Sequence, residues 1–218
     1  MKKTNHFYRF CALALSCLLL ISLLPVTQVL ADGDGAIHIK SAEDLRSLAH
    51  SCTLDSWSRG KTVVLDNDIE LTDDDELPIP TFGGTFNGNG HTIFGLNAIV
   101  DPNTTDAVGA ALFGHVYGGT IKNLTVKGIS NGKNYTAGIA AILFNGTISD
   151  CTSDVTVNGA RMIGGITGYM SNADCKLIRC ANTGNITGND TGAVGGVCGT
   201  ANKGEINACY NSGTVTCT

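Results

Sequence analysis

The chain contains 218 residues, of which 28 are glycine and 6% are aromatic, and its formal net charge is −5 at pH 7. This length is typical of one domain, and the glycine-rich, aromatic-poor composition favours an elongated repeat over a domain with one thick core. The acidic balance argues against nucleic acid or anionic lipid as a partner, because both require a basic surface.

Residues 1–31 have the pattern of a secretory signal peptide. Three basic residues precede an apolar run over 10–24, and Val29-Leu30-Ala31 fits the small-residue rule for cleavage. The apolar run is short for a membrane span, and no second such stretch follows. We therefore expect a secreted or cell-surface (extracellular) protein that has no membrane span after cleavage.

A lipoprotein signal at Cys17 is the alternative. The apolar run continues beyond Cys17, and the residues before it make a poor lipobox, so cleavage after Ala31 is favoured. This cleavage removes three of the 14 basic residues and none of the 19 acidic ones, which leaves a formal charge of −8.

One pattern returns through most of the remaining chain. A run of glycine and small or apolar residues precedes a turn and then alternating apolar residues, at 109–128, 138–151, 165–180 and 196–209, with a degenerate copy at 82–93. Equivalent residues recur at a nearly fixed spacing. The first set is apolar and consists of Ile93, Ile121, Ile148, Leu177 and Ile206, at intervals of 28, 27, 29 and 29. Two further sets have intervals of 29 residues: Cys151, Cys180 and Cys209, and Val157, Ile186 and Val215.

A fixed period of this length indicates a solenoid, in which each unit buries its apolar face against its neighbours. Short β-type runs broken by Gly and Asn, without helical spacing, predict an all-β, right-handed parallel β-helix of 27–29-residue repeats. We expect two or three short strands in each of four to five turns, with Gly and Asn at corners that need positive φ.

The repeats resemble a known family. Their Phe-Gly…Gly-x-Ile-x-Asn pattern is similar to the GLUG repeat of bacterial cell-surface β-helix proteins, and residues 82–96 look like the opening turn of that family. The resemblance covers the chain after the leader and implies a cap helix and first strands over 32–80 and GLUG-like repeats over 81–218. It says little about function, because the repeat occurs in adhesin-like proteins, in proteins of unknown role and beside immunoglobulin A-cleaving metalloproteases.

The segment Ser41–Ala49 predicts the cap helix. Ser41 can cap its N-terminus, Asp44 stands at the third helical position, and Leu45, Leu48 and Ala49 share one face. The helix would cover the open end of the β-helix, which otherwise exposes strand edges. The next two short strands are expected at 61–65 and 68–71.

The acidic run Asp73, Asp74, Asp75 and Glu76 is the candidate calcium site, because clustered carboxylates suit a hard cation. The run lacks the spaced ligands and turn glycine of a calcium loop, so a solvated loop is the favoured interpretation. Asp66 and Asp68 either join such a site or flank a corner. We expect no cofactor and no catalytic metal.

The cysteines after the leader number seven. Cys151, Cys180 and Cys209 occupy a position held by Leu124 in the preceding unit, which predicts an inward, stacked row of thiols. Disulfides among them, or with Cys175 and Cys198, are the alternative.

A catalytic centre is not expected. The chain has no His-Glu-x-x-His or Gly-x-Ser-x-Gly motif, and its histidines are scattered. The favoured function is therefore a non-catalytic module that binds a host or cell-wall glycan or protein, as in adhesion.

Two alternatives remain. A polysaccharide lyase or glycosidase would use Asp150, Asp154 and Arg179, which neighbouring turns bring to one face. In the second alternative the chain is the N-terminal piece of a larger adhesin or protease, because Val215–Thr218 ends in strand register without a polar cap. Such an end also predicts end-to-end association through the last turn.

Overall fold

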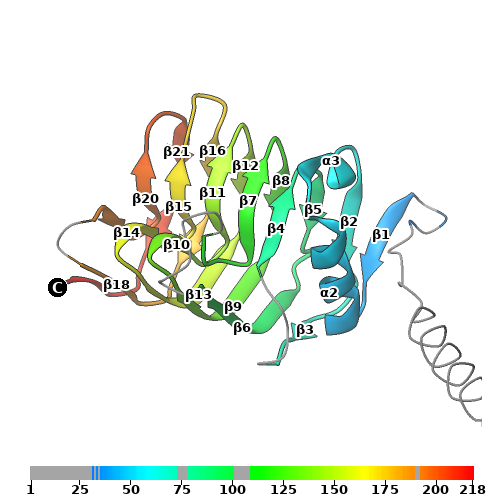
Figure 1. Ribbon diagram of the computed structural model, residues 1–218, viewed down its shortest axis with the longest axis horizontal. Helices are drawn as coiled ribbons and strands as arrows, with labels where there is room; N and C mark the ends of the chain where they lie inside the picture. Colours follow the sequence, from blue (N-terminus) through cyan, green and yellow to red (C-terminus); the bar gives the residue numbers. More distant parts are fainter. Residues whose placement is uncertain (1–30, 32, 34, 73–77, 101–108, 190–191) are drawn as a thin grey trace, which may run out of the picture.

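The computed structural model describes residues 31, 33, 35–72, 78–100, 109–189 and 192–218. These residues form a parallel β-solenoid with two short helices near its N-terminal end (Figure 1). The sequence prediction of a parallel β-helix is confirmed, whereas its right-handedness stays a prediction. The proposed signal peptide falls almost wholly on residues 1–30, outside the described part of the chain.

Sheet A runs the length of the solenoid and holds one strand from each turn. Its strands in spatial order are β1 (Ala36–Ile39), β2 (Thr62–Leu65), β5 (Thr85–Asn87), β8 (Thr120–Lys122), β12 (Thr147–Ser149), β16 (Lys176–Ile178) and β21 (Glu205–Asn207). The expected four to five turns are an undercount, because the repeat pattern is visible in the sequence only from residue 82 onward, whereas the sheet begins with β1. The solenoid therefore includes the first strands that were expected within 32–80, as β2 and β3 (Ile69–Glu70), and one further strand, β1.

Sheets B and C form the other two long faces. Sheet B contains β3 (Ile69–Glu70), β6 (Thr92–Ile99), β9 (Thr125–Asn131), β13 (Thr152–Asn158), the pair β17 (Ala181–Asn182) and β18 (Ile186–Gly188), and the pair β22 (Tyr210–Asn211) and β23 (Val215–Cys217). Sheet C contains β4 (Ile79–Phe82), β7 (Phe113–Tyr117), β11 (Ala140–Phe144), β15 (Thr167–Met170) and β20 (Cys198–Ala201). All these strands pair in parallel with the turns before and after.

A fourth sheet, which the sequence did not predict, is present only in the later turns. Sheet D contains β10 (Asn134–Ala137), β14 (Arg161–Gly164) and β19 (Val194–Gly195), and its strands lie against those of sheet C. The close approach explains the small residues of the repeated motif. A Cβ at Gly168 would stand 2.6 Å from the Met162 carbonyl oxygen, and one at Gly199 would stand 2.4 Å from the Ile163 nitrogen. Only glycine fits there.

The register of the strands confirms most of the predicted ladders and corrects one. Ile121 pairs with Ile148, Ile148 with Leu177, and Leu177 with Ile206 along sheet A. Ile93 does not belong to this ladder, because Phe86 is the residue opposite Ile121. Ile93 instead lies in sheet B opposite Val126. The 28-residue interval between Ile93 and Ile121 therefore joins residues on two different faces of the solenoid.

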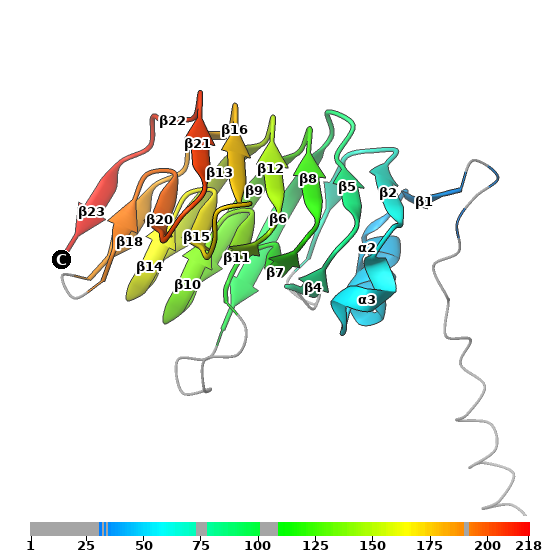
Figure 2. The ribbon, with the colours of Figure 1, turned by 90° about the horizontal axis from the view of Figure 1, so that it is seen from above.

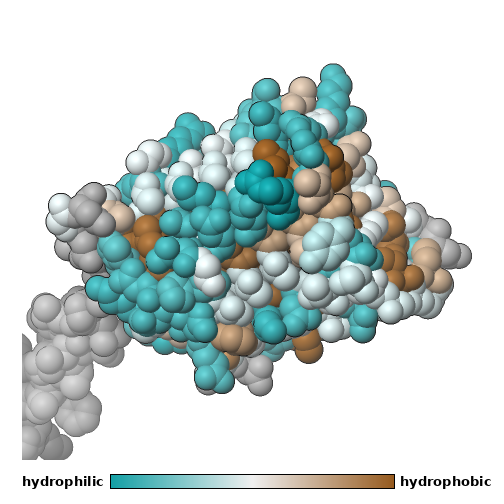
Figure 3. Space-filling model, turned by 180° about the vertical axis from the view of Figure 1, so that it is seen from behind, coloured by the Kyte–Doolittle hydropathy of each residue, from teal (hydrophilic) through white to brown (hydrophobic). Residues whose placement is uncertain are grey.

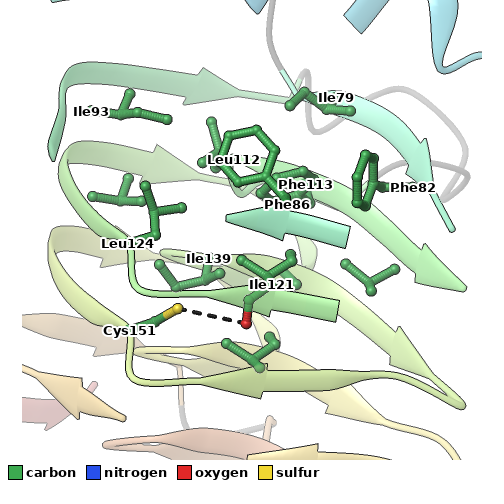
Figure 4. Packing of buried hydrophobic residues seen from close by; sticks show 14 of the residues in the cluster. Ile79, Phe82, Phe86, Ile93, Leu112, Phe113, Ile121, Leu124, Ile139 and Cys151 are labelled. Carbon is green, nitrogen blue, oxygen red and sulfur yellow. Dashed lines mark hydrogen bonds between the residues drawn. The ribbon is translucent and has the colours of Figure 1, made fainter. Parts of the chain in front are cut away.

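The core is a continuous column of inward side chains. Three phenylalanines fill its early part. The ring centroids of Phe82 and Phe113 lie 5.5 Å apart, and those of Phe86 and Phe113 lie 5.2 Å apart in an edge-to-face arrangement (Figure 4). All three are fully buried. Edge-to-face packing brings the positive ring edge against a negative ring face and adds to the hydrophobic gain.

The predicted helix is confirmed as α2 (Ala42–Ser51), with α3 (Asp55–Ser58) after it. Ser41 is its N-cap and accepts a hydrogen bond from the Asp44 N–H, and Leu45 and Leu48 are fully buried. The two helices contact β4, the end strand of sheet C. Figure 2 shows β1 beyond them, so the helices cover sheet C while β1 extends sheet A by one strand.

The opposite end of the solenoid exposes its last apolar rung. Ile206, Tyr210 and Val215 are 46%, 59% and 42% exposed. Their partners one turn earlier are buried: Leu177 and Ile186 completely, and Ala181 with 7% of its surface exposed. Each rung is thus shielded chiefly by the next one along the axis.

Replacement of Phe113 by alanine tests the importance of the aromatic core. We expect Phe113→Ala to lower the free energy of unfolding by about 3–5 kcal/mol, because it leaves a cavity between two other rings. The matched control is Phe94→Ala, since Phe94 is 37% exposed on β6 and its loss should cost about 1 kcal/mol or less. Chemical denaturation followed by circular dichroism measures both, and equal losses would contradict this packing.

Candidate functional site

The acidic candidates of the sequence are only partly described. Asp73, Asp74, Asp75 and Glu76 lie outside the described residues, so the calcium hypothesis stays a prediction. Within the described ranges, no cluster of three or more His, Cys, Asp or Glu side chains is arranged to hold a metal ion.

Asp66 and Asp68 both make cross-turn contacts at the corner between sheets A and B. The Asp66 carboxylate lies 2.7 Å from Nδ1 of His38. Asp68 accepts a hydrogen bond from the Thr92 N–H at 2.8 Å and lies 3.2 Å from His91 Nδ1. The Thr92 hydrogen bond, assisted by His91, lowers the pKa of Asp68. These contacts agree with the interpretation that both residues flank a corner.

Asp150, Asp154 and Arg179, the candidate lyase or glycosidase residues, form two separate ion pairs. Arg179 donates to both carboxylate oxygens of Asp150, at 2.6 and 2.7 Å, across neighbouring turns. This contact lowers the pKa of Asp150. Asp154 instead lies 3.2 Å from Nζ of Lys127 on the preceding turn. Asp150 and Arg179 are therefore together as expected, while Asp154 has a different cationic partner.

Asp150 and Arg179 also lie at the corner between sheets A and B, where the backbone adopts a left-handed conformation. Asn123, Asp150, Arg179 and Ala208 hold φ values of 53°, 54°, 51° and 52° at equivalent places in four successive turns. The prediction of Gly and Asn at such corners is correct for Asn123 and wrong for the others. Left-handed backbone is unfavourable for Arg and Ala; the bidentate ion pair offers Asp150 and Arg179 a compensating interaction.

The predicted row of thiols is confirmed. Cys151 and Cys180 hold the place of Leu124 and, like it, are at most 1% exposed; Cys209 continues the row in the half-covered last turn. The Cys180 N–H donates to Cys209 Sγ at 3.3 Å. Cys151 Sγ donates weakly to the Ile121 carbonyl oxygen, 3.8 Å away (Figure 4). In this structure all seven described cysteines are free thiols.

Burial makes several of these thiols poor nucleophiles. It raises the pKa of Cys52 and of Cys198 to about 12 in each case. The pKa of Cys151 is also raised well above its ordinary value, by its hydrogen bond with Cys180 and by burial. The pKa of Cys180 is lowered instead, chiefly by its hydrogen bond with Cys151. Since only the thiolate reacts readily, Cys52, Cys151 and Cys198 serve as packing groups. Cys217, by contrast, is exposed.

Alkylation of the reduced, folded protein by iodoacetamide tests this ranking. At pH 8 we expect Cys217 to react first, while Cys52 and Cys198 remain unmodified, because a pKa near 12 leaves almost no thiolate. Peptide mass spectrometry over a time course gives the rate at each site. Alkylation in guanidinium chloride is the control and should modify all seven cysteines of residues 32–218. Equal rates at Cys52 and Cys217 in the folded protein would contradict the described burial.

An exposed aromatic pair stands where sheet C turns into sheet A. Tyr117 ends β7 and Phe144 ends β11, in register on neighbouring turns. Their rings are stacked, with centroids 4.5 Å apart and planes 6° from parallel. Tyr117 is 43% exposed and Phe144 is half-buried. This pair was not predicted from the sequence, where the available signal is an aromatic residue directly before each of two successive corners.

Two asparagines lie beside the stacked rings. The Asn145 N–H donates to Asn172 Oδ1 at 3.2 Å, and Asn172 Nδ2 donates back to Asn145 Oδ1. Asn172 Oδ1 also accepts from Cys175 Sγ. Asn145 has a φ of 52°, a conformation that asparagine tolerates. We call Tyr117, Phe144, Asn145 and Asn172 the aromatic corner.

The fold and the candidate site define the class of this protein as a parallel β-solenoid that presents side chains in ladders along its outer faces. No protein-family model matches the chain. The chain is 33% identical over 151 residues to halomucin of Haloquadratum walsbyi, a match that covers 63% of this chain and only 2% of halomucin. This chain thus spans a very small part of that relative's length.

A solved structure has a similar fold. It is the crystal structure of a protein from Bacteroides ovatus described provisionally as an immunoglobulin A1 protease. The two structures align with a TM-score of 0.59 over 86% of this chain and 78% of the other, at 18% sequence identity. At this identity the likeness concerns the fold alone.

Neither α2 nor α3, the helices of the described part, has the length and apolar character that a membrane crossing needs.

Proposed function

We propose that this protein is an exported, extracellular β-solenoid module that recognises a glycan or protein at a cell or host surface and has no catalytic activity of its own. The observation that carries the proposal is the aromatic corner. Stacked, partly exposed rings beside interlocked amides form a rigid polar and aromatic surface on a scaffold held by cross-turn hydrogen bonds. Such pre-organised surfaces lose little entropy when they bind.

Export is supported by the leader-like sequence of residues 1–31. The similarity of a large part of the chain to halomucin, by its name a mucin, agrees with a place outside the cell. The acidic charge of the mature chain disfavours nucleic acid as the ligand. The small share of halomucin that is matched also supports the alternative that this module acts as one part of a larger surface protein.

A lyase or glycosidase is the second candidate, and the geometry supports it less. A glycosidase needs one carboxylate protonated and a second one free at a defined separation. Asp150 is held ionised by two hydrogen bonds from Arg179, and Asp154 is paired with Lys127. Each carboxylate therefore has its own neutralising partner, an arrangement suited to linking adjacent turns.

A parallel assay of binding and cleavage tests the proposed function. Residues 32–218 would be incubated with polysaccharides and glycoproteins, with and without calcium, and binding and product release would be measured together. We expect binding without turnover. Cleavage that is abolished by Asp150→Asn would overturn the non-catalytic proposal in favour of the enzyme. Binding that requires calcium and is lost on replacement of Asp73–Glu76 by serine would assign the acidic run as its metal site.

A further inference from the structure

We propose that the aromatic corner is a binding site for an uncharged pyranose unit of a glycan, an inference that rests on the proposed recognition function. Tyr117 and Phe144 supply the stacking surface. Asn145 and Asn172 supply amide groups that can exchange hydrogen bonds with sugar hydroxyls.

The ring geometry favours a flat ligand with polarised C–H bonds. Because Tyr117 and Phe144 are nearly parallel at 4.5 Å, each ring covers one face of the other and leaves its second face directed along the ladder. Aromatic faces are electron-rich, and one side of a pyranose ring presents C–H groups with partial positive charge. A sugar can therefore lengthen the stack.

Small residues stand on both sides of the stack. Gly83 follows Phe82, which pairs with Val116, so Gly83 is the residue of the preceding turn in register with Tyr117. It has no side chain of its own, and Cγ of Arg59 lies 3.2 Å from the point where its Cβ would stand. Ser171, whose N–H donates to the Leu143 carbonyl oxygen, holds the corresponding place next to Phe144. An aromatic or long residue at either place would have continued the ladder and closed it to a ligand.

The polar groups around the rings are fixed in position. The two hydrogen bonds between Asn145 and Asn172 join neighbouring turns, so the amides need little further ordering when a ligand binds. On the other side, the Arg59 side chain passes close to Gly83 and forms an ion pair with Asp55. The guanidinium and carboxylate of this pair offer a donor and an acceptor at the edge of the Tyr117 side.

The charge of the site favours a neutral sugar over a uronate or sulfated sugar. The two asparagines are uncharged, and Arg59 is balanced by Asp55. A mature chain with a formal charge of −8 repels anionic polymers, because 19 acidic residues then outnumber 11 basic ones. The proposed ligand is thus a neutral hexose polymer or glycan.

The test compares three variants of residues 32–218 for binding to an immobilised glucan, mannan and galactan, with pectate as the acidic polymer. Tyr117→Ala removes the exposed ring. Asn145→Gly removes one amide, and glycine suits this position because Gly118, its counterpart in the preceding turn, has a φ of 71°. Tyr210→Ala is the matched control, since Tyr210 is 59% exposed in the last turn and outside the aromatic corner. Thermal unfolding of each variant verifies that it is folded.

We expect the unmodified chain to bind a neutral polymer, and Tyr117→Ala to weaken this binding by about tenfold. Asn145→Gly should weaken it to a smaller extent, and Tyr210→Ala should leave it unchanged. Glycan binding that is equally strong in folded Tyr117→Ala and in Tyr210→Ala overturns the site but keeps the recognition function. Preference for pectate over the three neutral polymers overturns the neutral-glycan ligand. Failure to bind any of the four polymers overturns the glycan site, and failure to bind any polysaccharide or glycoprotein in the assay of the proposed function as well overturns both proposals.

Discussion

Parallel, in-register pairing of successive turns is the constraint on which the rest of this structure depends. Each strand satisfies its backbone hydrogen bonds with the same strand of the next turn, so residues one period apart must lie one above the other. An inward place is then inward in neighbouring turns, as for Ile121, Ile148 and Leu177. An outward pair such as Tyr117 and Phe144 stacks for the same reason.

Pairing along the axis also decides which residues are tolerated. Close contact between sheets D and C leaves room only for glycine at Gly168 and Gly199. At the corner between sheets A and B the backbone of Arg179 is held in a left-handed conformation that its own preference opposes. Pairing between turns therefore determines the backbone conformation here, against the preference of the residue. The ion pair with Asp150 offsets part of the cost of having arginine at a position that favours glycine or asparagine.

Much of the fold could be predicted from the sequence, because a period is visible without any knowledge of contacts. The spacing of Cys151, Cys180 and Cys209 predicted their stacking, and the residues from Ser41 to Ala49 predicted the helix. Ile93 was misplaced because a spacing identifies equivalent residues only when both belong to the same face. Sheet D was missed because its strands are short and contain the left-handed residues Tyr135 and Met162, which interrupt the alternation that marks a strand.

The aromatic corner could not be predicted for a related reason. Tyr117 and Phe144 precede corners of different sequence, and neither belongs to the apolar pattern that reveals the period. Their proximity arises only when the register is known. The site is thus a product of the ladder, and its rigidity comes from the same cross-turn bonds that build the fold.

A double-mutant cycle on Tyr117 and Phe144 tests the central claim most directly, since these residues are 27 positions apart in sequence and meet only if the turns are in register. The free energy of unfolding would be measured for the parent chain, each alanine variant and the double variant. The account predicts a coupling energy of about 0.5–1.5 kcal/mol, typical of a stacked aromatic pair. Effects that add to within about 0.3 kcal/mol, as expected of independent sites, would contradict both the register and the site built upon it.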